Sequence, residues 1–461
     1  MRFNDDTIAA ISTSVGNAGI GIIRISGKDS INIADRIIRS GSGKSLDLFS
    51  MPSHTVHYGF VMSDDKVIDE VLCAVYKSPK TYTAEDVVEI NCHGGSYVLN
   101  RVLDIVLSEG ARLAERGEFT KRAFLNGRID LSQAESVMDL ISSENEFIRS
   151  NSLLQLKGSV KNKINEIREK IIHESAYIEA ALDDPEHYDI DESYKKRLKE
   201  NIDLIIKDID KMISDSENAL VLKNGINTVI TGKPNVGKSS LLNLITGYER
   251  AIVTSVPGTT RDILSEKVKL GDIILNITDT AGIHESYDEV EKIGINKAEE
   301  EIKKADLILF MMDSVSGIDE NDIEILRKID NKNMIILVNK TDAGSEIKNS
   351  EIEKMSDTKA IFISVKENKG IDELKEVINN MFIKGEISEN RLYITNKRQI
   401  EELRSSKKSL LLVIDSINNK MSEDTYTIDM MDAYSHLGEI IGEDISDDLA
   451  DRIFNEFCMG K

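Results

Sequence analysis

The chain has 461 residues, too many for one hydrophobic core, so we expect two to four domains. Its net charge of −23 argues against broad electrostatic capture of nucleic acid, because phosphate contacts require Lys and Arg. Three cysteines are too few for a disulfide scaffold, and the sequence shows neither a secretory signal nor an apolar run of bilayer length. These features predict a cytoplasmic protein without a membrane span.

Residues 1–120 contain short apolar runs between turn residues, which predicts an α+β domain rich in strands. The run 19–27 predicts a buried strand, and Arg24 lies inside it. A buried guanidinium needs a partner, and Glu89 in the later run 82–90 is the natural one. The pair fits either a structural ion pair or a ligand pocket, and spacing alone does not separate the two.

Residues 121–222 change to a helical period. One long helix, ending at Asp183-Asp184-Pro185, is predicted to bury Ile164, Ile167, Ile171, Ile178 and Leu182. A second helix, ending near Asn224-Gly225, is predicted to bury Leu198, Ile202, Ile205, Ile209 and Met212. Both stripes indicate the core of a helical bundle.

Three basic clusters offer a local surface for nucleic acid. A solvated helix face is the simpler interpretation of each, because scattered Lys and Arg are ordinary surface residues. The clusters are Lys121-Arg122, Lys195-Lys196-Arg197, and Lys397, Arg398, Arg404, Lys407 and Lys408.

Residues 223–383 alternate strands with helices. The predicted strands are 228–231, 273–278, 307–312, 334–338 and 360–363, and continuous apolar runs among them indicate a parallel sheet with both faces covered. The helical period returns after about residue 390. We therefore expect an α/β nucleotide-binding domain inserted into a helical domain, whose halves, 121–222 and 384–461, pack together.

The stretch 232–240 reads Gly-Lys-Pro-Asn-Val-Gly-Lys-Ser-Ser, between a strand and a helix. This is the context of a phosphate-binding loop, in which backbone N–H groups and the helix N-terminus surround an anion. Lys238 is expected at the β- and γ-phosphates, with the Ser239 hydroxyl on Mg²⁺. The predicted contacts in this loop are Asn235, Val236, Gly237, Lys238, Ser239 and Ser240.

Three further motifs follow the predicted strands in order. Asp279, Thr280, Ala281 and Gly282 place a carboxylate and an amide near Mg²⁺ and the γ-phosphate. Asn339, Lys340 and Asp342 recognise the base, because the Asp342 carboxylate can accept from guanine N1 and N2, which adenine cannot satisfy. Ser364, Val365 and Lys366 lie where guanine O6 would be contacted. Four motifs in this order indicate a GTPase.

The stretch 254–262 has the Gly, Pro and Thr content of a switch segment, with Thr260 offered to Mg²⁺. Its predicted GTP contacts are Thr254, Ser255, Val256, Pro257, Gly258, Thr259 and Thr260. Ile283 stands where small signalling GTPases carry a water-orienting glutamine. Glu291 is the candidate for that role, and a solvated helix carboxylate is its alternative.

The whole chain resembles the MnmE (TrmE) family of tRNA modification GTPases. The resemblance rests on Asp6–Ala10, the segments 21–27, 82–95 and 117–139, the GTPase motifs, and the endings 437–442 and 457–461 with Cys-Met-Gly-Lys. The chain departs from the family pattern at 14–17, at Arg116 and at Asp184, which affects local loop shape.

The resemblance implies a homodimer that joins a flavin-dependent partner, MnmG, in a heterotetramer acting on tRNA. The pair would place an aminomethyl or carboxymethylaminomethyl group on carbon 5 of the wobble uridine. A 5-formyl- or 5,10-methylene-tetrahydrofolate would donate the one-carbon unit. The N-terminal domain, residues 1–120, would then bind the folate and form the dimer.

The resemblance also implies roles for particular residues. Arg24, Glu89, Arg128 and Lys461 would line the folate pocket, and Asn235, Thr254, Val256 and Thr259 would hold K⁺ during GTP hydrolysis. Glu291 matches the family's water-orienting glutamate. A regulatory switch GTPase of the ribosome-assembly type is the alternative for the whole chain, and it needs no folate domain.

Cys458 has three interpretations. The first is a buried, inert thiol. The second is a prenylation site, although Lys461 is a poor final residue for a prenylation motif. The third is a catalytic thiol whose thiolate form is favoured by the nearby Lys461.

Overall fold

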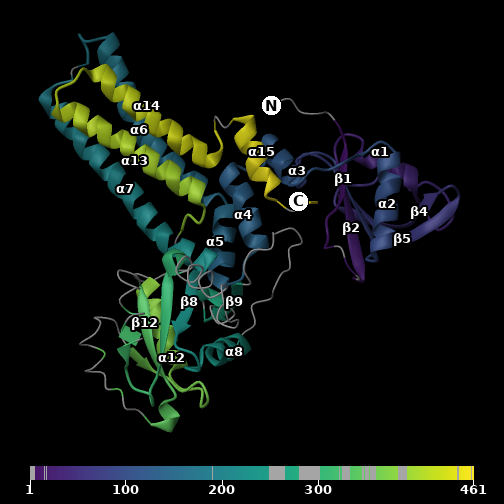
Figure 1. The fold of residues 1–461 in the computed structure, drawn as a ribbon. Helices are drawn as coiled ribbons and strands as arrows, with labels where there is room; N and C mark the ends of the chain where they lie inside the picture. The colour runs from purple at the N-terminus through teal and green to yellow at the C-terminus, as the bar shows by residue number, and fades with distance from the viewer. Residues whose placement is uncertain are drawn as a thin grey trace, which may run out of the picture. The chain divides into compact units, whose positions relative to one another are not determined.

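The computed structural model describes residues 6–14, 16, 18–188, 190–248, 265–271, 273–279, 302–320, 322–323, 326, 333–344, 347, 352, 360–382, 392–443, 446–457 and 459–460. The chain divides into two compact units. Figure 1 labels helices and strands that compose them. The first comprises Met1–Ile141, Leu154–Ile205 and Ser405–Lys461, and the second comprises Ser142–Leu153 and Ile206–Arg404. Three of the four boundaries between these units, 153/154, 205/206 and 404/405, fall inside helices, so this division does not test the four domain ranges, which remain predictions.

The first unit contains a seven-stranded sheet in the order β3-β4-β5-β6-β2-β1-β7. Neighbouring strands are antiparallel except β1 and β7. Helices α1 (Ser30–Ile37) and α2 (Ser96–Ser108) bury their apolar faces in one core with the sheet. The strands are β1 (Ile8–Ile11), β2 (Ile20–Ser26), β3 (Ile38–Arg39), β4 (Thr55–Ser63), β5 (Lys66–Tyr76), β6 (Val87–His93) and β7 (Arg112–Leu113).

Helices form the rest of this unit, and three of them continue into the second. The helices within the first unit are α3 (Glu118–Leu125), α4 (Leu131–Ile141), α6 (Ser159–Asp183), α14 (Glu423–Ile441) and α15 (Asp447–Asn455). Those shared between the units are α5 (Glu146–Leu156), α7 (Glu192–Asn224) and α13 (Lys397–Asn418). Within the described residues, no helix is long and apolar enough to cross a membrane.

The predicted apolar stripe of the first long helix is confirmed at Ile164, Ile167, Ile171 and Ile178, which are fully buried on α6. Leu182 was predicted to be buried with them, and that is wrong, because its side chain is 47% exposed. It lies in the last turn, just before the helix ends at Asp183.

The second unit contains a six-stranded sheet in the order β13-β12-β11-β8-β10-β9. All neighbours are parallel except β9 and β10, and apolar clusters cover both faces. The predicted α/β class is confirmed, with β9 as an additional edge strand. The elements are β8 (Ile226–Gly232), α8 (Lys238–Tyr248), β9 (Ser265–Leu270), β10 (Ile273–Asp279), β11 (Leu307–Asp313), β12 (Met334–Asn339), the short 3₁₀ helix η2 (Thr341–Ala343), β13 (Ala360–Phe362) and α12 (Ile371–Phe382).

Arg122 was expected on a solvated helix face, and the structure corrects this expectation. Its side chain is 5% exposed, and its guanidinium donates to Asp6 Oδ1 at 2.7 Å, to Glu118 Oε1 at 3.1 Å and to Glu85 at 3.2 Å. Arg112 donates to Asp6 and Glu118 as well, at 2.7 and 2.6 Å. These five residues form a charge cluster in which Arg122 and Glu118 are buried and the other three are partly exposed.

The charge cluster predicts a loss of stability in acid. Partial burial is the largest single influence and raises the pKa of Asp6 and of Glu118, but the hydrogen bonds and charges of Arg112 and Arg122, with the Glu115 amide for Glu118, together outweigh it and lower both. The pKa of either carboxyl in the unfolded chain is about 4. Because the pKa in the folded protein is lower, each carboxyl stabilises the fold fully at a pH above the unfolded-state pKa. This contribution is lost as the pH falls through the folded-state pKa.

Thermal unfolding followed by circular dichroism between pH 5 and pH 3 checks this prediction. We expect the melting temperature to fall over this range, with a shallower slope for Glu118→Gln because that variant lacks one of the two titrating groups. An identical slope in both proteins would contradict the assignment.

Candidate functional site

The phosphate-binding loop lies between β8 and α8, at the carboxyl edge of the parallel strands. Its backbone has positive φ at Gly232, Asn235 and Gly237 (142°, 64° and 105°). A Cβ on Gly232 would lie 2.3 Å from the carbonyl oxygen of Met311, and one on Gly237 would lie 2.4 Å from Asn339 Nδ2. Glycine is therefore required at both positions, because the loop packs against the ends of β11 and β12.

The cationic and hydroxyl groups of the loop gather where α8 begins. Lys238 Nζ donates to the carbonyl oxygens of Gly232 and Lys233, both at 2.8 Å. Ser239 and Ser240 are exposed in the first turn of the helix. Val236 is 3% exposed, so its side chain is core and its backbone alone can face a ligand. A helix N-terminus with a lysine beside it favours a phosphate group.

Asn339 connects the loop to the base-recognition segments. Its Nδ2 donates to the carbonyl of Val236 at 2.8 Å, and its Oδ1 accepts from the Val365 amide at 3.2 Å. Lys340, with φ of 67°, pairs with Asp313 at 2.6 Å. Asn339 therefore connects the end of β12 to the phosphate-binding loop at Val236 and to the segment 364–366 at Val365.

Asp342 and Ser364 converge although they follow different strands. The Ser364 hydroxyl donates to Asp342 Oδ1 at 2.7 Å, and Lys366 Nζ lies 4.0 Å from Oδ2. The Ser364 hydrogen bond lowers the pKa of Asp342, so the carboxylate is ionised at neutral pH. An ionised acceptor here suits the N–H donors on the edge of a guanine.

Several predicted residues lie outside the described part of the chain. They are Thr254, Ser255, Val256, Pro257, Gly258, Thr259, Thr260, Thr280, Ala281, Gly282, Glu291, Cys458 and Lys461. Asp279 ends β10, paired with Ile230 of β8, and its backbone is described. Of the residues expected to hold Mg²⁺ or K⁺, Ser239 and Asn235 are described, and their oxygen donors suit these hard cations.

Arg24 and Glu89 pair as predicted, and together they form a second candidate site. They are directly opposite on β2 and β6, and Arg24 Nε and Nη2 both lie 2.9 Å from Glu89 Oε1. Among the described residues, no donor bonds to Glu89 Oε2. Arg128, the third predicted pocket residue, donates to the carbonyl of Tyr82 at 2.9 Å.

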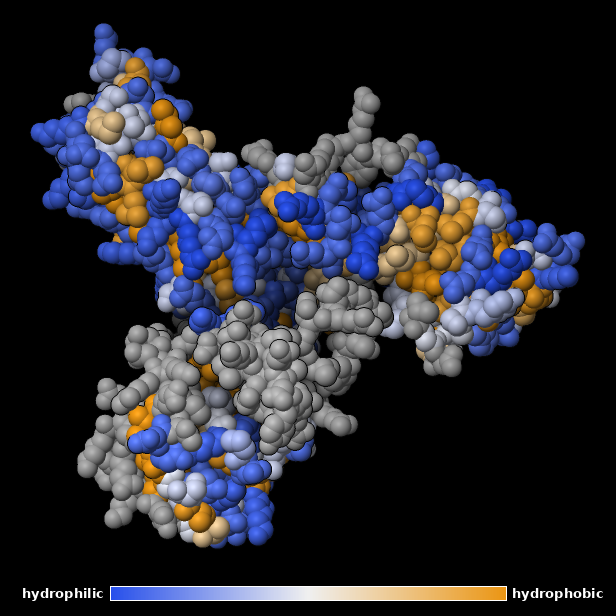
Figure 2. Space-filling view, in the orientation of Figure 1, coloured by the Kyte–Doolittle hydropathy of each residue, from blue (hydrophilic) through white to orange (hydrophobic). Residues whose placement is uncertain are grey.

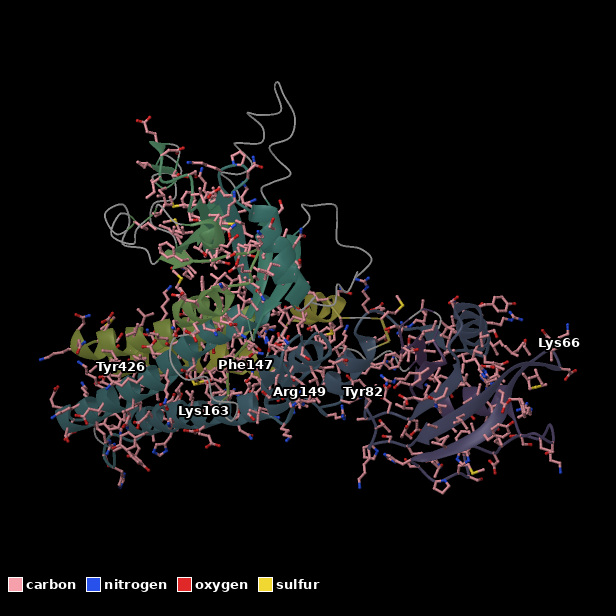
Figure 3. All side chains as sticks on the ribbon, turned by 90° about the horizontal axis from the view of Figure 1, so that it is seen from below. Lys66, Tyr82, Phe147, Arg149, Lys163 and Tyr426 are labelled. Atoms are coloured by element: carbon pink, nitrogen blue, oxygen red, sulfur yellow. The ribbon has the colours of Figure 1, made fainter. Side chains whose placement is uncertain are left out.

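Aromatic rings complete this site, and the sequence analysis did not assign them. The Arg24 guanidinium lies 5.3 Å from the ring centre of Tyr82 and 5.6 Å from that of Phe119, and Arg128 lies 5.0 Å from Tyr82. The Tyr82 hydroxyl hydrogen-bonds Thr120 Oγ1 of α3 at 2.9 Å (Figure 3 labels Tyr82). The site thus combines cations, a carboxylate and π faces, which suits a flat heteroaromatic ligand with an amidine-like edge. The sequence offered one signal for Tyr82, because it begins the same segment, 82–90, that contains Glu89.

Comparisons with known proteins match the whole length of the chain to one family. A family model for the MnmE helical domain matches residues 131–458, and a model for the GTP-binding protein TrmE N-terminus matches residues 7–128. Proteins named tRNA modification GTPase MnmE from Lachnoclostridium phytofermentans, Clostridioides difficile and Acetivibrio thermocellus are 49%, 45% and 46% identical to this chain. The alignments cover 99% of this chain and of the first relative, and 100% of both chains for the other two.

Proposed function

The chain belongs to the MnmE family of tRNA modification GTPases, and on this premise we propose that it hydrolyses GTP to support modification of tRNA. With MnmG, it adds an aminomethyl or carboxymethylaminomethyl group to carbon 5 of the wobble uridine. A single observation carries this proposal. One chain contains both a set of guanine nucleotide motifs and a separate polar–aromatic site at Arg24 and Glu89.

The nucleotide site works by positioning and charge. Asp342 accepts from the guanine edge, the loop amides and Lys238 hold the phosphates, and Glu291 orients the attacking water. Ser239 and Thr260 would hold Mg²⁺, and Asn235, Thr254, Val256 and Thr259 would hold K⁺. Bound cations supply positive charge to the phosphate oxygens.

The second site binds the tetrahydrofolate that supplies the one-carbon unit. Glu89 Oε2 accepts from the N–H edge of the pterin ring, and Arg24 holds the carboxylate in place through Oε1. Tyr82, which is partly exposed, covers apolar surface of the ligand, and Arg128 and Lys461 add positive charge for its carboxylates. Cys458 is the candidate thiol at the reacting carbon.

Dimerisation through the N-terminal domain has support from its surface. Ile20, Val56, Tyr58 and Leu72 are 65%, 60%, 52% and 48% exposed. Figure 2 shows apolar side chains gathered on this domain. Exposed apolar groups in such number favour a protein partner.

Binding of 5-formyl-tetrahydrofolate tests the folate site. We expect a saturable rise in melting temperature for the full chain, because a ligand that binds the folded state stabilises it. Glu89→Gln removes the ionised acceptor and should weaken binding at least about tenfold. Glu109→Gln is the matched control, since Glu109 pairs with Arg36 at the surface. If the wild-type protein gains no stability, the assignment of a folate to this site is wrong.

A further inference from the structure

The last described residues of the chain are held beside Arg24. Ser12 Oγ donates to the carbonyl oxygen of Gly460 at 3.0 Å, and Arg24 Nη1 donates to the same oxygen at 3.5 Å. Met459 forms an antiparallel bridge with Arg116. Residues 459–460, named here the C-terminal segment, therefore lie against the end of β1 and contact the Arg24 guanidinium.

Glycine is required at two positions where the C-terminal part of the chain packs closely against the N-terminal part. Gly117, before α3, has φ of 65°, and a Cβ there would lie 2.4 Å from the carbonyl oxygen of Phe454. Gly460 has φ of 86°, and its Cβ would lie 2.3 Å from the carbonyl oxygen of Ile11. A Cβ atom essentially never lies within 3.0 Å of a heavy atom outside its own and the adjacent residues, so either substitution would displace backbone.

The direction in which the C-terminal segment leaves α15 is set by α3. Phe454 and Phe457 are 1% and 3% exposed and share an apolar cluster with Ala123 and Phe124 of α3. The rings of Phe124 and Phe454 are 6.0 Å apart. Gly117 is the residue before α3. The turn at Gly117 therefore sets the position of α3, and through α3 the position of α15 and of the C-terminal segment.

We propose that Ser12 and Gly117 are positioning residues that hold the C-terminal segment against the Arg24 guanidinium of the Arg24–Glu89 site. The inference rests on the proposed function, since the ligand of that site is taken to be a tetrahydrofolate. Arg24 is restrained by Glu89, by two aromatic rings and by the Gly460 carbonyl. Release of the segment removes the Gly460 contact and leaves the Arg24 guanidinium less well oriented for the ligand.

Hydrogen exchange of peptides from 447–461 and 5-formyl-tetrahydrofolate binding, both on the full chain, test the proposal. Gly117→Ala should raise exchange in these peptides and weaken binding at least about tenfold. Ser12→Ala should weaken binding about fivefold, as expected for one lost hydrogen bond, and Ser12→Thr should restore it. GTP hydrolysis should stay within about twofold of wild type.

Gly158→Ala is the matched control. Gly158 also precedes a helix with positive φ, 88°, but a Cβ there would be 3.8 Å from its nearest neighbour. It should behave as wild type in both assays. Unchanged exchange in Gly117→Ala and Ser12→Ala would overturn the proposal, as would increased exchange with unchanged ligand affinity. If wild type itself does not bind the ligand, the proposed function fails, and the exchange measurement still decides whether these residues hold the segment.

Discussion

Asp342→Asn should convert a guanine nucleotide site into a xanthine nucleotide site. The carboxylate accepts from guanine N1–H and the 2-amino group, whereas an amide presents one donor and one acceptor. Xanthine has a carbonyl in place of the amino group, so it matches the amide. We expect GTP affinity to fall on the order of 100-fold or more, and xanthosine triphosphate to bind the variant better than GTP.

Equilibrium binding of both nucleotides to wild type and variant checks this expectation. Glu367→Gln is the control, since the same change of group removes a nearby carboxylate that pairs with Lys369 at 2.6 Å. It should leave the preference for GTP intact. Unchanged GTP affinity in Asp342→Asn would refute the assignment of guanine recognition.

Arg122→Met should destabilise the first unit by about 3–5 kcal/mol, because it leaves the buried Glu118 and the partly buried Asp6 without one of their two cations. The methionine fills similar space, so lost charge rather than lost volume dominates. Arg36→Met is the control. Arg36 pairs with Glu109 at 2.7 Å but its side chain is 52% exposed, so we expect at most about 1 kcal/mol.

Urea unfolding followed by circular dichroism measures both variants. The expected result is an early transition in Arg122→Met and a curve close to wild type in Arg36→Met. Equal, small effects would mean that the charge cluster contributes no more than a surface ion pair.

Local patterns predicted the second unit well. Its strands are continuous apolar runs, and the phosphate-binding loop is specified by glycines within one short stretch. The motifs after β8, β12 and β13 meet because the carboxyl ends of parallel strands share an edge of the sheet. The pairing of Asp342 with Ser364 follows from that topology.

Distant contacts explain what the sequence did not predict. Arg122 was interpreted from its neighbour Lys121, but its partners Asp6 and Glu85 lie 116 and 37 residues away. The contact between Arg24 and Gly460 spans 436 residues. The contact with Gly460 depends on how α15 packs on α3, which no local periodicity encodes. The Arg24–Glu89 pair was the exception, because a buried guanidinium demands a carboxylate.

Nucleoside mass spectrometry of total tRNA tests the central proposal most directly. Cells without this chain should lose the aminomethyl-type uridines at carbon 5, and the wild-type chain should restore them. Neither Glu89→Gln nor Asp342→Asn should do so, since each disables one of the two sites. An unchanged nucleoside profile on deletion would contradict the account and leave a GTPase without a modification role.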